Sequence, residues 1–483
     1  MPTIAFDALD YHADQTFGTA HYRITGDGQG WSVLRNGAPW LELGPGYRLL
    51  RTRVCGVCST DLARHHLPFP LPQVIGHEVI ATDEQGRRFV VEINASHQAR
   101  GVATDCPFCR AGLPTHCPER LTIGIHGLPG GFGPWLLAPV GACVEVPPNV
   151  PDSAAVLVEP FAAALHAVLT LAPRAGERIA VLGPRRLGML VVAALAAVRA
   201  QAEEGEEFAI VALARDPALL TLARSFGATE ALPVDDLASG LGDQTFDCVI
   251  DTTGNPEALA TAVRLARREV HVKSTHGRPS CGLTQLTGLV VDEISLAAFP
   301  HDATGAIAGT APWQQLRTGS RPRVAWLPPA PPPAWLLQTA DVARGDAATL
   351  LRGYQQTRDG LPRADCVVAS TAADVDAAIR PLAGDEIALV RPRGTVLVLA
   401  DAAERSPLLR AITDRGLRLS SSRCGDFHAA LALLAGDAEL RRIGERLVTH
   451  RFGAADLPAA FAMARSRACI KAVVAQGAAE GNA

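Results

Sequence analysis

Residues 54–80 read VCGVCSTDLARHHLPFPLPQVIGHEVI, and they combine a thiol, a hydroxyl and a carboxylate within the four residues from Cys58 to Asp61. A Gly-His-Glu triplet at 76–78 follows a proline-rich turn. Cysteine sulfur and histidine nitrogen are ligands that zinc prefers, and three protein ligands with one open position make a zinc site catalytic rather than structural. Alone, Cys58 is most simply a small buried apolar residue and His77 a core histidine. Together they indicate a metal site.

The pattern GVCSTD followed by PxxxGHE resembles the catalytic zinc signature of the medium-chain, zinc-dependent alcohol dehydrogenases. This resemblance implies that zinc binds Cys58 and His77, with Glu78 as a further ligand beside them. It places Thr60 where the family keeps the hydroxyl that passes the alcohol proton outward. Asp61 falls where a carboxylate orients the metal ligands, which is how such partners fix ligand geometry.

The same resemblance implies an α/β fold with two domains, a Rossmann-type parallel-sheet cofactor domain and a β-rich, GroES-like catalytic domain. We expect residues 1–160 and 425–483 to form the catalytic zinc domain and residues 161–424 to form the cofactor domain. Short alternating apolar and polar runs with Gly-Asp-Gly and Asn-Gly turns in residues 1–52 predict strands and hairpins.

Composition excludes several classes of protein. The 483 residues carry a net charge of -4 with acidic and basic residues interspersed, which gives no electrostatic reason to expect nucleic acid as a partner. The N-terminus lacks the basic start and apolar run of a signal peptide, and no run of about eighteen apolar residues occurs, so we expect a cytoplasmic protein with no membrane partner. Eleven cysteines, with CxxC pairs near histidines, predict reduced thiols and metal ligands.

Residues 103–117, ATDCPFCRAGLPTHC, are a second candidate metal site. The family's structural zinc lobe spaces four cysteines as CxxCxxCx7C. Here Cys106, Cys109 and Cys117 take the last three places, and Ala103 stands in the first. Three thiolates do not complete a tetrahedral zinc shell, so the alternative is a lobe held by packing alone.

Two further ligand assignments stay open in the sequence. Asp105, His97 or His116 could supply the fourth ligand of the lobe, because carboxylate and imidazole both bind zinc. Glu159 stands before a proline at the end of an apolar run, where relatives carry a glutamate that ligates the catalytic zinc or holds its water. A glutamate favoured by the macrodipole at a helix start is the simpler alternative.

Residues 177–188, ERIAVLGPRRLG, predict a dinucleotide site. An apolar strand runs into Gly183, and a long apolar helix follows Gly188, which is the strand, tight turn and helix of such a site. Arg185 occupies the place of the middle glycine, where it either crowds the cofactor pyrophosphate or pairs with it. The predicted cofactor-binding residues of this turn are Gly183, Arg185, Arg186, Leu187 and Gly188.

The next strand, FAIVALARDP at 208–217, indicates which cofactor is bound. NAD-specific folds place an acidic residue at the end of this strand for the ribose 2′-hydroxyl, whereas NADP sites offer arginine. Ala214 occupies that place and Arg215 follows, and a carboxylate there would repel a phosphate. We therefore expect NADP rather than NAD, with a solvated surface arginine as the alternative interpretation.

Three more residues are predicted to contact the cofactor. Thr252 follows the strand at 246–251, on the side where nicotinamide contacts usually lie. Lys273 ends the strand at 269–273, before a loop that borders the nicotinamide and the substrate in dehydrogenases of this type. Lys471 falls where relatives place a cation against the cofactor pyrophosphate.

An internal repeat accounts for the chain's excess length over such a two-domain enzyme. FDCVIDTTG at 246–254 resembles ADCVVASTA at 364–372, an offset of 118 residues (364 − 246), and VVDEISLAAF at 290–299 resembles TDRGLRLSSS at 413–422. We interpret residues 300–400 as an inserted partial repeat of the second half of the cofactor domain. It has no glycine-rich turn and is not expected to bind a second dinucleotide.

The inserted repeat contains a proline-rich stretch, WLPPAPPPAW at 326–335, that suits a stiff linker or a sheet edge. In relatives the edge of the cofactor sheet commonly pairs across a two-fold axis to make a dimer. We expect the repeat to lie along that edge inside one chain and to mimic the partner subunit, which leaves a monomer or a homodimer as the expected state.

The function that the resemblance implies is zinc-dependent hydride transfer between a nicotinamide cofactor and a small alcohol or polyol, or its carbonyl. A non-catalytic, dehydrogenase-like scaffold that uses the repeat for protein contacts is the main alternative, motivated by Arg185 and Ala103. A zinc enzyme of unrelated chemistry on the same site is a third.

Overall fold

The computed structural model describes residues 3–234, 242–274, 277–284, 286–300, 321–355, 361–379, 388–399 and 404–477. Parts of the predicted insert at 300–400, such as 301–320, therefore lie outside the described residues. The chain forms two compact units. Unit 1 comprises residues 1–163 and 424–483, and unit 2 comprises residues 164–423.

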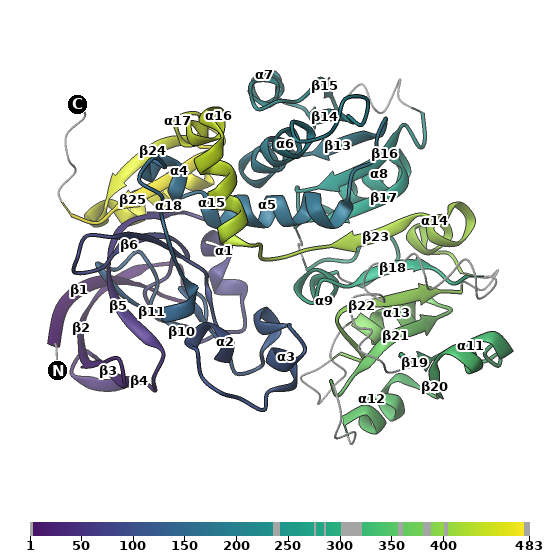
Figure 1. Ribbon diagram of the computed structural model, residues 1–483, viewed down its shortest axis with the longest axis horizontal. Coiled ribbons are helices and arrows are strands. Elements are labelled where there is room, and N and C mark those ends of the chain that lie inside the picture. Colours follow the sequence, from purple (N-terminus) through teal and green to yellow (C-terminus); the bar gives the residue numbers. More distant parts are fainter. Residues whose placement is uncertain are drawn as a thin grey trace. The chain divides into compact units, whose positions relative to one another are not determined.

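Unit 1 consists mostly of β structure, as the alternating N-terminal sequence predicts (Figure 1). Its strands are β1 Thr3–Tyr11, β2 Phe17–Asp27, β3 Gly30–Arg35, β4 Ala38–Leu43, β5 Tyr47–Gly56, β6 Glu78–Thr82, β7 Arg88–Val91, β8 Asn94–Ala95, β9 Leu121–Ile123, β10 Gly127–Leu128, β11 Trp135–Pro139, β12 Cys143–Glu145, β24 Val448–Gly453 and β25 Lys471–Ala475. Its helices are α1 Ser59–Leu62, α2 His97–Arg100, α3 Pro107–Arg110, α4 Asp152–Ala155, α15 Phe427–Gly436, α16 Ala438–Arg441, α17 Ile443–Leu447 and α18 Leu457–Arg465, with 3-10 turns η1 Arg64–His66, η2 Pro114–His116, η3 Val140–Ala142 and η5 Ala454–Asp456.

The sheets of unit 1 bring distant segments together. In the described part of the chain the largest sheet has the order β12-β7-β6-β5-β25-β24, with β11 also paired to β5. Val474 of β25 pairs with Cys55 of β5, so the C-terminal strand lies beside the strand that leads into the 54–80 stretch. Apolar side chains of these strands and of α18 form one buried core.

Unit 2 is an α/β unit that begins within α5 Val158–Leu171. Its strands are β13 Arg178–Leu182, β14 Ala209–Ala214, β15 Glu230–Pro233, β16 Phe246–Asp251, β17 Ala266–Val272, β18 Ser295–Ala298, β19 Arg323–Trp326, β20 Asp341–Arg344, β21 Ala364–Ala369, β22 Val390–Val398 and β23 Arg418–Ser421. Its further helices are α6 Arg186–Arg199, α7 Pro217–Ser225, α8 Pro256–Leu265, α9 Thr287–Val291, α11 Ala334–Thr339, α12 Ala347–Gln355, α13 Ala372–Ile379 and α14 Pro407–Arg415.

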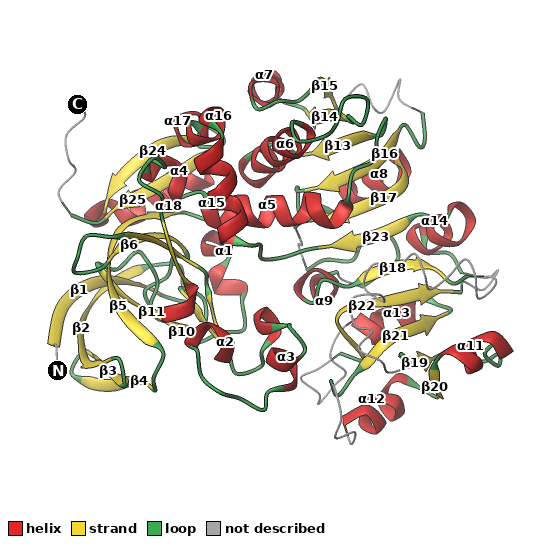
Figure 2. Cartoon of the chain, viewed as in Figure 1, coloured by secondary structure: helices red, strands yellow, loops and turns green. Residues whose placement is uncertain are grey.

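Across the described ranges, the strands of unit 2 form one 11-stranded sheet with the order β15-β14-β13-β16-β17-β23-β18-β22-β21-β19-β20. The pairs are parallel except where β18 meets β23, which are antiparallel. Helices alternate with these strands along the chain (Figure 2). The strands are apolar on both faces, as expected for a parallel sheet covered by helices.

The segment between the two resembling stretches is part of this sheet and not a linker. β22 pairs with β18, and β21, β19 and β20 follow β22 in the same sheet that contains β13 to β17. This is the arrangement expected for a repeat that lies along the sheet edge. The proline-rich stretch begins at Trp326, the last residue of β19, and its indole N–H donates to the Ala330 carbonyl at 2.7 Å. It is therefore an ordered strand-to-helix connection, which corrects the expectation of a stiff linker or edge.

Candidate functional site

Cys58 lies just beyond the end of β5, at the N-cap of the short helix α1. Its backbone N–H donates to Asp61 Oδ2 at 2.8 Å, so the helix start holds the carboxylate in a fixed orientation. Thr60 lies in the same helix and is half-buried, whereas Asp61 is buried. The sequence therefore places a thiol, a hydroxyl and a carboxylate on one turn of backbone.

His77 completes the pair that the sequence predicts. Asp61 Oδ1 lies 3.1 Å from His77 Nδ1, and both side chains are buried. The preceding Gly76 has φ +100° and a Cβ there would come within 2.7 Å of Cys55 Sγ, so this turn requires glycine. Burial lowers the pKa of His77, but the carboxylate of Asp61 and the thiol of Cys58 outweigh it and raise that pKa well above its ordinary value.

Glu78 and Lys471 form a buried ion pair in unit 1. Lys471 Nζ contacts Glu78 Oε2 and donates to the Val57 carbonyl at 3.0 Å. Burial lowers the pKa of Lys471, but Glu78, followed by Cys58, raises it above the ordinary value. A Cβ at Gly56 would lie 2.2 Å from Glu78 Oε2, so the glycine makes room for this pair. The predicted contacts of Glu78 with zinc and of Lys471 with the pyrophosphate stay predictions.

Glu159 lies in the first turn of α5, within unit 1. Among the residues that the structure describes, Glu159 and Glu78 do not form a cluster of three or more potential metal ligands with Cys58 and His77. The structure therefore brings the cysteine and histidine together with their orienting aspartate. The glutamates as third ligands stay predictions.

The second candidate metal site is a compact cluster of four residues, His97, Cys106, Cys109 and Cys117. Their ligand atoms all lie within 4.8 Å of one another. His97 Nδ1 is 3.3 Å from Cys117 Sγ and 3.7 Å from Cys109 Sγ, and Cys106 Sγ is 3.9 Å from Cys117 Sγ. A tetrahedral zinc with Zn–S of about 2.3 Å and Zn–N of about 2.0 Å requires S···S of about 3.8 Å and S···N of about 3.5 Å.

The lobe therefore fits zinc, and its geometry distinguishes among the three candidate fourth ligands. His97 faces the thiols, whereas Asp105 is exposed and outside the cluster. His116 is buried but also lies outside the cluster, with its Nδ1 3.2 Å from Thr115 Oγ1. Burial and the neighbouring thiols raise the pKa of Cys117 to about 12. A cation bound between the thiols would lower this pKa.

Glu119 is a functional candidate that sequence reasoning missed. Its Oε2 lies 3.2 Å from His97 Nε2, the ring nitrogen turned away from the thiols. A carboxylate behind a metal-ligating histidine fixes the ring orientation and the tautomer. Its position two residues after Cys117 was the only available signal, and this position becomes informative once the structure places His97 beside the three thiols.

In unit 2, β13, the glycine turn and α6 have the arrangement that the sequence predicts. Gly183 has φ +82°, and a Cβ there would lie 2.6 Å from Thr253 Cγ2. A Cβ at Gly188 would lie 2.5 Å from the Gly183 carbonyl oxygen, so both glycines are required for close helix and strand packing. Arg185 is the N-cap of α6 and Leu187 is half-buried in its first turn.

Arginines gather at the carboxyl ends of two adjacent strands. Arg185 and Arg186 follow β13, and Arg215 follows β14. These strands are parallel neighbours, with Leu182 opposite Leu213, so all three arginines lie at the same edge of the sheet. Arg215 is exposed, and the adjacent Asp216 accepts a hydrogen bond from the Ala218 amide at 2.9 Å as the cap of α7.

The hydrogen bonds observed for Thr252 and Lys273 join neighbouring strands of the sheet and the segments that follow them. The Thr252 hydroxyl donates to the carbonyls of Leu182 at 3.0 Å and Gly183 at 2.9 Å, which fixes the turn. Lys273 is buried, and its ammonium donates to Ser422 O at 2.8 Å, Ser422 Oγ at 3.0 Å and Arg423 O at 2.7 Å. Three acceptors occupy its three protons. The predicted cofactor contact of Lys273 stays a prediction, and the observed contacts are structural.

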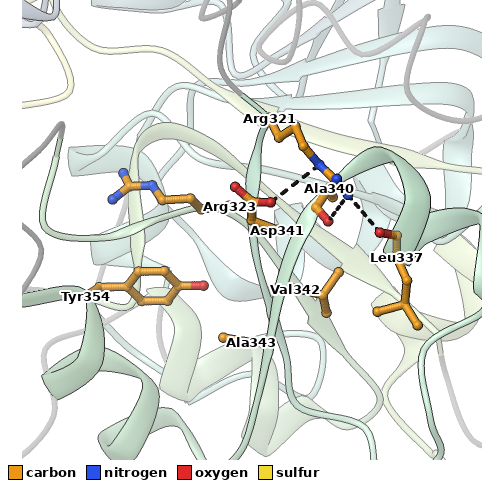
Figure 3. Close-up of a pocket in the computed structure, with 8 residues that line it drawn as sticks. All are labelled: Arg321, Arg323, Leu337, Ala340, Asp341, Val342, Ala343 and Tyr354. Atoms are coloured by element: carbon orange, nitrogen blue, oxygen red, sulfur yellow. Dashed lines mark hydrogen bonds and ion pairs between the residues drawn. The ribbon is translucent and has the colours of Figure 1, made fainter.

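A surface pocket of about 580 Å³ lies elsewhere in unit 2 (Figure 3). Arg321 contacts Asp341 at 3.4 Å on one side, and Arg323 and Tyr354 form another wall. Arg323 and Asp341 are the first residues of β19 and β20, so the pocket lies at the amino ends of these strands. Ligands of open α/β sheets bind at the carboxyl ends, and this pocket shares no residue with the sites above.

Comparisons with known proteins find similarity to dehydrogenases. The alcohol dehydrogenase GroES-like domain family matches residues 44–148. L-threonine 3-dehydrogenase of Aeromonas salmonicida is 29% identical over 237 residues, which is 46% of this chain and 67% of that protein. L-threonine 3-dehydrogenase of Edwardsiella ictaluri is 27% identical over 239 residues, again 46% of this chain and 67% of that protein.

Solved structures share the fold. A short-chain alcohol dehydrogenase from E. coli CFT073, complexed with NADH, has a TM-score of 0.59 at 16% identity and covers 98% of this chain and 99% of its own. Galactitol-1-phosphate dehydrogenase from Escherichia coli has a TM-score of 0.54 at 14% identity, covering 97% of this chain and 100% of its own. None of the helices in the described ranges is long and apolar enough to cross a membrane.

Proposed function

Because the chain belongs to the medium-chain, zinc-dependent alcohol dehydrogenase family, we propose that it is an NAD(P)-linked oxidoreductase that interconverts a small alcohol or polyol and its carbonyl. The observation that carries this function is the Cys58, Asp61 and His77 constellation, with Asp61 Oδ1 3.1 Å from His77 Nδ1. We further propose that unit 1 is the zinc domain and unit 2 the cofactor domain.

The residues of unit 1 suit a zinc ion at Cys58 and His77. Asp61 accepts from the Cys58 amide, and its Oδ1 lies 3.1 Å from His77 Nδ1, so the other ring nitrogen is left for the metal. When bound, zinc supplies Lewis-acid polarisation of the substrate oxygen and the nicotinamide supplies or accepts the hydride. Cys58 and His77 hold the metal, with Glu159 proposed as the third ligand.

Thr60 is proposed to move the proton. Thr60 lies in the helix that Cys58 caps, and the residue is half-buried, which supports a position between the metal pair and solvent. A hydroxyl both donates and accepts hydrogen bonds, which is what a proton relay at the alcohol oxygen needs. The buried Glu78 and Lys471 pair stabilises β6 and β25 behind the metal pair.

A second zinc is proposed in the lobe, bound by His97, Cys106, Cys109 and Cys117. The separations of their ligand atoms support it, because they approach those of a tetrahedral shell. Glu119 orients His97 through its Nε2. Four protein ligands leave no open position, so this zinc is structural.

For the cofactor we propose NADP rather than NAD. Arg215, exposed at the carboxyl end of β14, supplies the cation that a 2′-phosphate requires, and Asp216 is committed to capping α7. Gly183 and Gly188 allow the backbone to approach the pyrophosphate, with Arg185 and Arg186 at the same edge.

A non-catalytic scaffold is the second candidate function. One observation favours it. Arg185 replaces the middle glycine of the turn, and its amide donates to the Gly183 carbonyl at 2.8 Å rather than pointing toward a ligand. Binding of NADPH and NADH to the zinc-loaded protein, measured by calorimetry, separates the two. Micromolar NADPH binding together with oxidation of at least one polyol or small alcohol supports the enzyme. Full zinc content without binding of either cofactor supports the scaffold.

A further inference from the structure

The strands of the two repeats of unit 2 correspond in chain order, apart from β15, which has no counterpart in the described part of the second repeat. In chain order, β13, β14, β16, β17 and β18 of the first repeat (178–298) match β19, β20, β21, β22 and β23 of the second (323–421). Both begin with the same contact, because the Arg178 amide donates to Asp247 Oδ2 at 2.8 Å and the Arg323 amide donates to Asp365 Oδ2 at 2.9 Å. The second repeat thus includes the opening strands, and it is larger than the sequence predicted.

The register irregularities of the sheet match as well. The pairing of β16 with β17 shifts between Phe246 and Cys248, and that of β21 with β22 shifts between Ala364 and Cys366. Beyond the shift, Glu269 is opposite Cys248 and Thr395 is opposite Cys366. This register makes His271 equivalent to Leu397 and Lys273 equivalent to Leu399.

The repeats meet about a local two-fold axis. β18 and β23 pair antiparallel through Leu296 and Leu419. The two strands begin 123 residues apart (418 − 295), and so do these two leucines (419 − 296), so each is the other's equivalent. Contact of a residue with its own equivalent across an antiparallel pair is the geometry of a symmetric dimer interface, here within one chain.

The last strands of the two repeats are exchanged. β18 follows β17 along the chain, yet it pairs with β22 of the second repeat. β23 follows β22, yet it pairs with β17 of the first. Each repeat therefore donates its final strand to the other (Figure 1).

A run of buried polar side chains joins β17 to β23, and we name Glu269, His271, Lys273, Ser420 and Ser422 the polar ladder. The Ser420 hydroxyl donates to Glu269 Oε1, and it lies 2.8 Å from His271 Nδ1. His271 Nε2 is 2.9 Å from Ser422 Oγ, which in turn accepts from Lys273 Nζ at 3.0 Å. All five residues are buried, so hydrogen bonds within the protein replace those that their polar atoms would make to water.

The equivalent positions of the other pair are apolar. On β18, Ala297 lies opposite Leu397 of β22. Phe299 continues β18 and packs against Trp326 and Trp335, with ring centroids 5.5 Å and 5.7 Å apart. Only the first position of this pair is polar, where the hydroxyls of Ser295 and Thr395 are 3.0 Å apart.

We propose that the polar ladder selects β23, rather than its equivalent β18, as the partner of β17, and that the second repeat is a symmetric counterpart of the first held within the same chain. With β18 beside β17, Ala297 would face His271 and Phe299 would face Lys273, which would leave a buried imidazole and a buried ammonium without these acceptors. The interaction surface at this sheet edge is therefore closed by the chain itself, and it is not available to a second copy.

Cysteine pairs test which strands are neighbours. Val270 lies opposite Leu419, so Val270→Cys/Leu419→Cys is expected to form a disulfide in most molecules, and Val270→Cys/Leu296→Cys in fewer than about one in ten, because β23 separates those strands. The two pairs are then placed in a protein without the ladder, His271→Leu/Lys273→Leu/Ser420→Ala/Ser422→Phe. Strand selection predicts at least a tenfold rise of the 270–296 link there. An unchanged ratio of the two links would overturn it.

A milder comparison covers the case in which that protein does not fold. Ser420→Ala/Ser422→Ala removes the ladder hydroxyls, and Ser295→Ala removes the matched hydroxyl of the apolar pair. Amide exchange of β17 and β23 should accelerate at least tenfold more in the first variant than in the second. Equal acceleration would contradict the ladder.

A separate experiment tests whether the second repeat pairs with the first within one chain. Leu296→Cys/Leu419→Cys should give a disulfide within one chain, detected at the mass of a single chain under non-reducing conditions. A link that joins two chains would show that a second copy, and not the internal repeat, completes this edge.

Discussion

At the scale of the residue, the geometry of the cysteine lobe depends on a single helix cap. Three cysteines at the expected spacing predicted the lobe, but three nearby side chains were equal candidates for the fourth ligand. His97 lies in the cysteine cluster because Ser96 caps α2 through the Ala99 amide at 3.1 Å, which fixes the first residue of that helix beside the thiols. This proximity depends on the three-dimensional fold of residues 94–123 and is absent from any local pattern.

Substitution at His97 tests the lobe. His97→Ala is expected to lower the zinc content by about one equivalent, because three thiolates do not complete the shell. Glu119→Gln is expected to weaken zinc at this site roughly 10- to 100-fold, the usual effect of losing a carboxylate behind a metal-ligating histidine. Chelator competition measures both, with His116→Ala as the matched control. Retention of both zinc ions by His97→Ala would contradict the assignment.

Arg215 decides the cofactor prediction. Arg215→Ala should weaken NADPH binding by roughly 1.5 to 3 kcal/mol, the range for a hydrogen bond to a charged group, and leave NADH nearly unchanged. Arg224→Ala, another exposed arginine of the same unit, is the control and should affect neither cofactor. Calorimetric titration gives both affinities. Equal losses for the two cofactors would show that Arg215 is only a surface residue.

At the scale of the element, the strands and their order along the chain could be predicted from the sequence. Which strands lie side by side in the sheet could not. The strand at 246–251 has the bounds that its apolar run predicts, and the helix expected after Gly188 is α6, which begins two residues earlier, at Arg186. The proline-rich stretch was wrongly expected to be a linker or an edge. Its role depends on Trp326, the last residue of β19, whose indole N–H donates to the Ala330 carbonyl.

A buried carboxylate at the junction of the repeats gives a pH dependence. Glu293 pairs with Arg393 at 2.6 Å and accepts from the Arg423 amide at 2.7 Å. Burial raises its pKa, but Arg393 and His166 prevail and lower it from 4.5 to about 2. A depressed pKa contributes stability that is complete above about pH 4.5 and is lost as the pH falls toward about 2.

Glu293→Gln isolates this contribution. Lowering the pKa of Glu293 from 4.5 to about 2 corresponds to roughly 3 kcal/mol of stability at neutral pH, at about 1.36 kcal/mol for each pH unit. The variant should therefore be less stable by about that amount at pH 7. The difference from the unmodified protein should shrink below pH 4.5. Chemical denaturation at several pH values measures it, with the exposed Glu439→Gln as the control. A difference that is independent of pH would contradict the ion pair.

At the scale of the whole molecule, the resemblance predicted the family and the kinds of domain, whereas composition only excluded other classes. The repeat was visible as two short similarities. Its opening strands were missed, although RIAVLGP at 178–184 resembles RVAWLPP at 323–329. The exchange of β18 and β23 could not be read. Its cause is the match of buried polar groups between strands that are about 150 residues apart, such as His271 and Ser420.

Metal analysis of Cys58→Ser beside the unmodified protein is the most direct test of a catalytic zinc at Cys58 and His77. We expect two zinc ions per chain in the unmodified protein and one in Cys58→Ser, with the lobe zinc retained and NADP-linked turnover lost. Retention of the full zinc content by Cys58→Ser would contradict it.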